Sequence, residues 1–172
     1  MLNGNQPEPT AKVIVLYVGM MDVQQADQVR ASVQHLQNAI PSPQDPDVFP
    51  TQMDTIATQI TAAAGLLKDM TNKAQILLMG LLPVTGYDSK GKPSYTMNSQ
   101  IASGLKQIND KLKAYGLAEP RVSYIDCMNS FLTKSGGNTI DSKLYSNTNV
   151  PTKEGFKKLA ACINKQIDQY MA

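Results

Sequence analysis

The stretch Lys12-Val13-Ile14-Val15-Leu16-Tyr17-Val18-Gly19-Met20-Met21-Asp22 decides the fold. Apolar or aromatic side chains stand in a row from position 13 to position 17, and no alternation separates a wet face from a dry one. Such a run is typical of a parallel strand that is covered on both faces, so we predict a central strand here. Ligands of open α/β sheets bind beyond the carboxyl ends of the strands, and this places the search for a site at residues 19–22.

Two further apolar runs predict two further parallel strands. Residues 74–83 end at Pro83, and residues 121–126 end at Asp126. Apolar residues at spacings of three and four predict four helices between and after the strands, over residues 23–40, 51–70, 97–115 and 156–170. We expect Thr51 to cap the second helix at its start and Gly116 to close the third as a left-handed C-cap.

The order of these elements predicts the fold class. Strands alternate with helices, so right-handed crossovers give an α/β domain of three layers with a short parallel sheet between helices. A length of 172 residues predicts a single domain over residues 1–172, with residues 1–11 as a flexible N-terminus. Three loops, residues 19–22, 84–94 and 134–150, are expected to converge at the carboxyl edge of the sheet.

Composition excludes several classes of function. The net charge is +2 and the lysines are scattered along the sequence, so we expect no nucleic-acid partner. The longest apolar run is about half a membrane span, and we expect no spanning helix. Residues 1–9 lack the features of a signal peptide, which leaves an intracellular protein or a secreted one whose leader has been removed.

The two cysteines, Cys127 and Cys162, belong to no Cys-x-x-Cys or Cys/His cluster. A secreted protein could pair them, whereas a cytosolic one would bury both as small hydrophobic residues. The sequence leaves these alternatives open. It predicts neither a metal site nor a cofactor.

Four blocks of the chain resemble the SGNH or GDSL ester hydrolases, a family that includes platelet-activating-factor acetylhydrolase-like proteins and carbohydrate acetyl esterases. Residues 13–22 resemble the family's pattern of a strand followed by Gly-x-Asn-Asp. Residues 76–83 resemble its strand followed by Leu-Pro, and residues 122–126 resemble its strand that ends in aspartate. Its C-terminal Asp-x-x-His-Pro-Asn-x-x-Gly-Tyr resembles Asn147 to Phe156. The resemblance implies an SGNH-hydrolase-like (flavodoxin-like) fold that covers the later two thirds of a family member and lacks the first strands.

The positions that carry chemistry in this family are altered. Asn147 stands in place of the orienting aspartate, Val150 in place of the histidine base, and Met21 in place of the asparagine that helps to bind the oxyanion, while Gly19 and Asp22 fit the pattern. Valine cannot accept a serine proton, and a thioether cannot donate a hydrogen bond. We therefore expect no catalytic residue, and a remnant crevice formed by these five residues.

Other candidates for chemistry have simpler interpretations. His35, the only histidine, is predicted within a helix away from the loops, and Ser89, Ser94 and Ser146 are predicted to be turn residues. Asp22 and Asp126 could form a pair of carboxylates, but each is as easily a cap. Methionines gather near strand ends, where they either fill the core or line an apolar crevice: Met20, Met21, Met79 and Met128.

The sequence thus predicts a degenerate SGNH/GDSL hydrolase-like domain that is noncatalytic and acts as a binding or assembly module. The expected ligand is a small carbohydrate or a lipid-like molecule. Without the family's first strands, the strand at residues 13–18 would lie on an edge, which predicts a homo-oligomer or a partner chain there. The alternative is an active ester hydrolase, an acetyl esterase or lipase-like enzyme with an atypical catalytic constellation. A third interpretation, a flavodoxin-like binding module, would need a phosphate-binding glycine loop that Gly19 alone does not supply.

Overall fold

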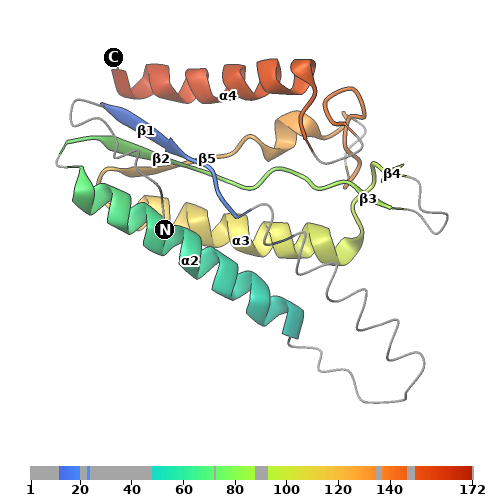
Figure 1. Ribbon diagram of the computed structural model, residues 1–172, viewed down its shortest axis with the longest axis horizontal. Helices are drawn as coiled ribbons and strands as arrows, with labels where there is room; N and C mark the ends of the chain where they lie inside the picture. Colours follow the sequence, from blue (N-terminus) through green and yellow to red (C-terminus); the bar gives the residue numbers. More distant parts are fainter. Residues whose placement is uncertain are drawn as a thin grey trace.

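The computed structural model describes residues 12–19, 23, 48–71, 73–87, 93–134, 137–146 and 150–171. The predicted flexible N-terminus lies outside the described residues, as does the predicted first helix apart from Val23. The described residues form a parallel sheet, three long helices and a small hairpin (Figure 1).

The sheet has three parallel strands in the order β1-β2-β5, formed by Val13–Leu16, Gln75–Met79 and Val122–Ile125. The central strand is β2, so the prediction that residues 13–18 form the central strand is wrong, whereas the edge position expected for this strand is confirmed. Four of the five β2 residues are buried, but Val15 of β1 is 38% exposed. An unbroken apolar run predicts a strand, but it does not encode the order of strands.

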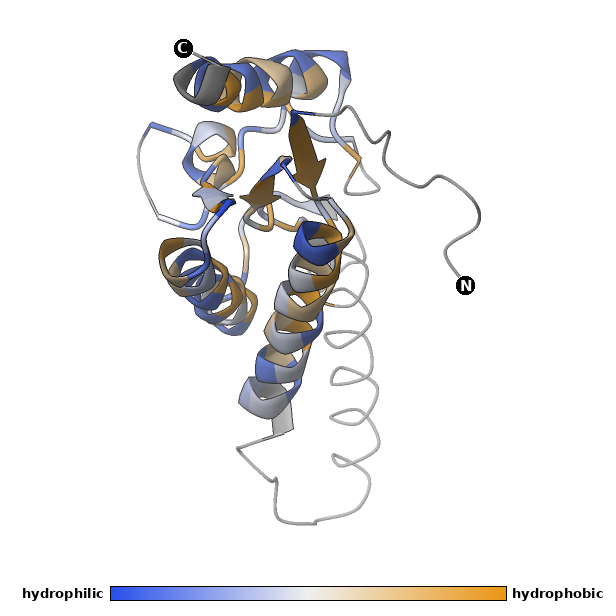
Figure 2. Ribbon diagram, turned by 90° about the vertical axis from the view of Figure 1, so that its left-hand side faces the viewer, coloured by the Kyte–Doolittle hydropathy of each residue, from blue (hydrophilic) through white to orange (hydrophobic). Residues whose placement is uncertain are grey.

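Helices cover both faces of the sheet. Helices α2 (Val48–Met70) and α3 (Ser99–Ala118) lie together on one face, and α4 (Lys153–Met171) lies alone on the other (Figure 2). The predicted three-layer α/β fold is confirmed. A two-stranded antiparallel hairpin, β3 (Gly86–Tyr87) with β4 (Pro93–Ser94), lies near the start of α3.

Two predicted helix ends are corrected. Helix α2 begins at Val48, so Thr51 lies inside the helix and not at its cap. Helix α3 continues through Gly116 as far as Ala118, with Glu119 as its C-cap. A Cβ atom on Gly116 would lie 2.8 Å from the backbone nitrogen of Tyr124, so this glycine permits close contact between α3 and β5.

The core lies mainly between the sheet and the pair α2 and α3. Its largest fully buried side chains come from β2, β5, the two helices and the segments that follow β2 and β5: Met53, Ile76, Leu77, Leu78, Met79, Leu81, Leu82, Leu105, Ile108, Leu112, Ile125 and Phe131. Helix α4 packs with partly buried side chains and is also joined covalently, because Cys127 and Cys162 form a disulfide. The described part of the chain contains no helix that meets the length and hydropathy needed to span a bilayer.

Candidate functional site

The carboxyl end of β1 is shaped by Gly19. Its φ is +94°, a conformation that favours glycine, and a Cβ atom there would lie 2.5 Å from Cδ1 of Ile60 on α2. Its carbonyl oxygen accepts a hydrogen bond from the backbone N–H of Val23 at 3.3 Å. Gly19, which was predicted as a crevice residue, is therefore also required by the fold, because the chain turns here directly against α2.

An open hollow of about 110 Å³ lies beside this turn. It is lined by residues from β1's exit and from α2: Val18, Gly19, Ile56, Gln59 and Ile60. The amide of Gln59 is the one polar side chain among them. The hollow is small and mostly apolar, so it suits a small uncharged group better than an ion.

Asn109 fixes the carboxyl end of β2. Its Oδ1 accepts a hydrogen bond from the backbone N–H of Leu81 at 2.7 Å, and its Nδ2 donates to the carbonyl oxygen of Leu81 at 3.0 Å. The side chain is buried, so these bonds satisfy both its own amide and a peptide unit beyond the strand. The sequence did not single out this residue, although a signal existed, since Asn109 is a polar residue on the apolar face of the helix that Leu105 and Leu112 define.

The carboxyl end of β5 leads into a single 3-10 turn, η1 (Met128–Phe131). Asp126 caps this turn, because its Oδ1 accepts the backbone N–H of Met128 at 2.9 Å. Asp22, its suggested partner in a carboxylate pair, lies outside the described residues. Among the described residues no group of three or more His, Cys, Asp or Glu side chains could hold a metal ion.

The loop before α4 is closed by backbone hydrogen bonds around Val150. The carbonyl oxygen of Val150 accepts the backbone N–H and the hydroxyl of Ser146, each at 2.9 Å, and Tyr145 pairs with Pro151 as an isolated bridge. The Val150 side chain is 50% exposed. Ser146 therefore directs a hydroxyl bond to the backbone of its own turn.

The start of α4 depends on Thr152 and Gly155. The hydroxyl oxygen of Thr152 accepts the backbone N–H of Gly155 at 3.1 Å, while the hydroxyl donates to the carbonyl oxygen of Lys143 at 2.7 Å. A Cβ atom on Gly155 would overlap the carbonyl oxygen of Leu144 and lie 3.0 Å from Cβ of Pro151. The Pro-x-x-x-Gly frame of this block thus positions the helix against the preceding loop.

Two phenols, one partly buried after β1 and one buried before α4, have raised pKa values: Tyr17 and Tyr145. Burial raises the pKa of Tyr17 to about 12, although the backbone N–H of Leu82, which bonds its hydroxyl, opposes the shift. Burial likewise raises the pKa of Tyr145, with a smaller contribution from Tyr17. The hydroxyl of Tyr145 has no hydrogen-bond partner among the described residues, and its ring packs against Phe131 with centroids 5.4 Å apart. Neither phenol was identified from the sequence.

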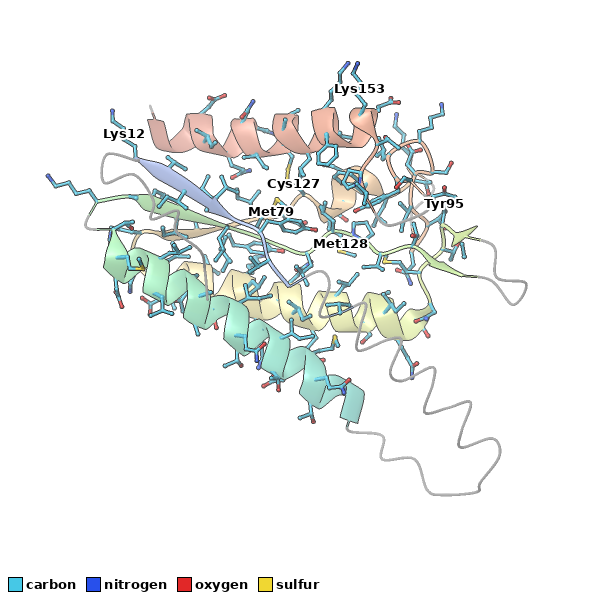
Figure 3. All side chains as sticks on the ribbon, viewed as in Figure 1. Lys12, Met79, Tyr95, Cys127, Met128 and Lys153 are labelled. Carbon is cyan, nitrogen blue, oxygen red and sulfur yellow. A yellow bond between two sulfur atoms is a disulfide. The ribbon has the colours of Figure 1, made fainter. Side chains whose placement is uncertain are left out.

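The structure describes two of the five predicted crevice residues. Gly19 follows β1 and Val150 precedes α4, whereas Met21, Asp22 and Asn147 fall outside the described residues, so the predicted crevice stays a prediction. The same is true of three other candidates: His35, Ser89 and Met20. Within the described part, Met79 fills the core and Met128 packs against it, with its sulfur 3.6 Å from Nδ2 of Asn109 (Figure 3).

Solved structures identify the fold class. The chain is similar to a protein described as a platelet activating factor from Streptococcus pneumonia, with a TM-score of 0.59 and 10% identity over 90% of this chain and 59% of that one. It is also similar to a protein assigned as an acylhydrolase from Bacteroides fragilis, with a TM-score of 0.60 and 16% identity over 94% of this chain and 63% of that one. The chain therefore has an SGNH/GDSL hydrolase-like fold and spans about six tenths of these two neighbours. No protein-family model and no curated protein sequence matches it.

Proposed function

We propose that the chain is a noncatalytic, degenerate SGNH/GDSL hydrolase-like domain that acts as a binding or assembly module. One observation carries this proposal: the block at residues 145–156 keeps its structural frame while a valine occupies the position of the base. Pro151, Thr152 and Gly155 hold the start of α4, and Val150 contributes only its carbonyl oxygen to a turn. Without a proton acceptor a serine hydroxyl is a weak nucleophile at neutral pH.

The hydrogen bonds of Ser146 support the same conclusion. A nucleophilic serine donates its proton to a base, but the hydroxyl of Ser146 donates to the backbone carbonyl of Val150 at 2.9 Å. The hydrolase assignments of the two structural neighbours suggest acyl compounds as the ligands to test first. We propose a small carbohydrate or a lipid-like molecule as the ligand class, in keeping with the mostly apolar hollow beside Gly19.

The decisive experiment combines hydrolysis with binding. We expect p-nitrophenyl acetate to be hydrolysed no faster by the wild-type chain than by the Ser146→Ala and Asp126→Ala variants. Saturation-transfer NMR with N-acetylglucosamine and with glycerol triacetate then tests for binding without turnover. Hydrolysis that disappears in either variant would support the alternative, an active ester hydrolase of atypical construction.

The assembly part of the proposal rests on β1. Among the described strands β1 pairs only with β2. Val15 within β1 is 38% exposed, and Val18, two residues beyond its end, is 42% exposed. An unprotected apolar edge favours pairing with another chain. We therefore expect light scattering to show a dimer or larger species that Val15→Lys dissociates. The matched control is Leu117→Lys, at an exposed position on α3, and equal effects of the two variants would remove the edge from the proposal.

A further inference from the structure

Charges that are scattered in the sequence are separated in the fold. Residues 134–168 contain six lysines and three acidic residues, whereas the rest of the chain contains ten basic and eleven acidic residues. This basic segment includes the loop before α4 and α4 itself, which lies alone on its side of the sheet (Figure 2). One side of the domain is therefore positively charged although the whole chain is nearly neutral.

The lysines of this side form no ion pair with the residues that the structure describes. The ion pairs of the described residues all involve α2 or α3: Lys68 with Glu119, Lys106 with Asp110, and Lys111 with Asp54. No ion pair among the described residues involves a lysine of the segment 134–168. Figure 3 shows Lys153 extending from the start of α4 away from the sheet. These ammonium groups are available to an external anion.

Two large apolar side chains are exposed among the lysines. Val150 is 50% exposed and Phe156 is 53% exposed, and both belong to the short segment between Lys143 and Lys158. Their backbone is held in place, since the Phe156 N–H donates to the carbonyl oxygen of Thr152 at 2.8 Å. Exposed apolar side chains that alternate with lysines around one end of a helix are typical of proteins that bind at the boundary between lipid headgroups and acyl chains.

We propose that a basic–apolar face, formed by Lys143, Val150, Lys153, Phe156, Lys157 and Lys158, docks the domain on an anionic lipid surface. The lysines would lie at the headgroup phosphates while Phe156 and Val150 enter the acyl boundary. A nucleic acid would use the lysines but offers no apolar phase for an exposed valine, so a bilayer satisfies both features better. Glu154 lies on the same turn and reduces the charge of the face without cancelling it.

Vesicle co-sedimentation of the full chain tests this proposal. Vesicles of phosphatidylcholine alone are compared with vesicles that contain about one third phosphatidylserine, at low salt and at about 0.15 M salt. We expect binding only to the anionic vesicles and weaker binding at the higher salt. Because each lysine near such a surface contributes about a fivefold increase in partitioning, Lys157→Glu with Lys158→Glu should reduce it by at least about 25-fold.

The other variants separate this face from general charge effects. Phe156→Ser should weaken partitioning about fivefold, because roughly half of a phenylalanine side chain remains to be buried by the lipid. Lys106→Glu with Lys113→Glu makes the same change of net charge on α3, across the sheet, and should have little effect. Equal loss in the two double variants, no binding to anionic vesicles at low salt, or tighter binding to a duplex oligonucleotide than to vesicles would overturn the proposal. Circular dichroism melts verify that each variant is folded.

Discussion

Removal of the disulfide should destabilise the domain strongly. The bond joins Cys127, directly after β5, to Cys162 in the middle of α4, and it closes a segment of 35 residues. The entropy of closing such a loop in the unfolded chain corresponds to about 4 kcal/mol of stability. For a chain of this length the loss corresponds to a fall of roughly 8–15 °C in melting temperature.

The assay is equilibrium unfolding in urea, with Cys127→Ala and Cys162→Ser combined in one variant. Cys127 is fully buried and Cys162 is partly exposed, which is why alanine suits the first position and serine the second. The oxidised and reduced forms of the wild type provide the control, because they differ in the covalent bond without any substitution. Both cysteines lie in the described part of the chain and both belong to the disulfide, so titration of the oxidised protein should find no free thiol.

The expected pattern is specific. The double variant and the reduced wild type should lose similar stability and should show a steeper dependence on urea, because the unfolded chain without a cross-link exposes more surface. A loss below about 1 kcal/mol in both would refute the entropic account. A loss in the variant alone would instead point to altered packing around Cys127, which is surrounded by core residues.

Four further outcomes follow from residues after β1 and around the start of α4. In urea unfolding, Tyr145→Phe should leave stability unchanged or raise it by about 1 kcal/mol, because it removes a buried hydroxyl that has no partner among the described residues. Tyr17→Phe should instead lower stability by about 1 kcal/mol, because the Leu82 N–H loses its acceptor. In a thermal melt, Gly155→Ala should cost about 2 kcal/mol or more, since the new Cβ overlaps the carbonyl oxygen of Leu144. The free energy of unfolding should also fall as the pH rises from 10 to about 12. In this range Tyr17 is ionised in the unfolded chain, where its pKa is 10, but still protonated in the folded chain, where its pKa is raised to about 12. Urea unfolding should therefore show a loss of about 1.4 kcal/mol per pH unit from this residue.

The elements of the fold could be predicted from local sequence, but their order in the sheet could not. Strands form at residues 13–16, 75–79 and 122–125, within the apolar runs as expected, and helical spacing located α2, α3 and α4. Strand order depends on which apolar surfaces meet, and periodicity carries no information on that. For this reason β2, not β1, occupies the centre.

Glycine shows a similar ambiguity. Gly116 was predicted as a C-cap because glycine favours the left-handed conformation, yet it lies inside α3 and allows β5 to approach. Gly19 does adopt a positive φ and also faces Ile60. The same residue type meets both needs, and only the tertiary partner distinguishes them.

The polar residues of the candidate site were the least predictable. Asn109 binds the peptide of Leu81, which lies 28 residues away, and Tyr145 is buried against Phe131 from a neighbouring turn. Their roles depend on long-range contacts, whereas sequence patterns report local periodicity. The resemblance to a hydrolase block drew attention to residues 147–156, but it did not reveal which of these residues fold the chain.

That distinction determines how the block at residues 145–156 is interpreted. Thr152 and Gly155 are required by the start of α4, and Pro151 pairs with Tyr145, so these residues would be needed in any domain of this shape, whether or not it hydrolyses esters. Their presence therefore does not argue for catalysis. Val150 is different: its side chain is half exposed, and the two bonds that Ser146 makes to it end on its backbone carbonyl oxygen. We expect a histidine to be tolerated at such a position, so the residues that hold the start of α4 and the proposed loss of the base are separate questions.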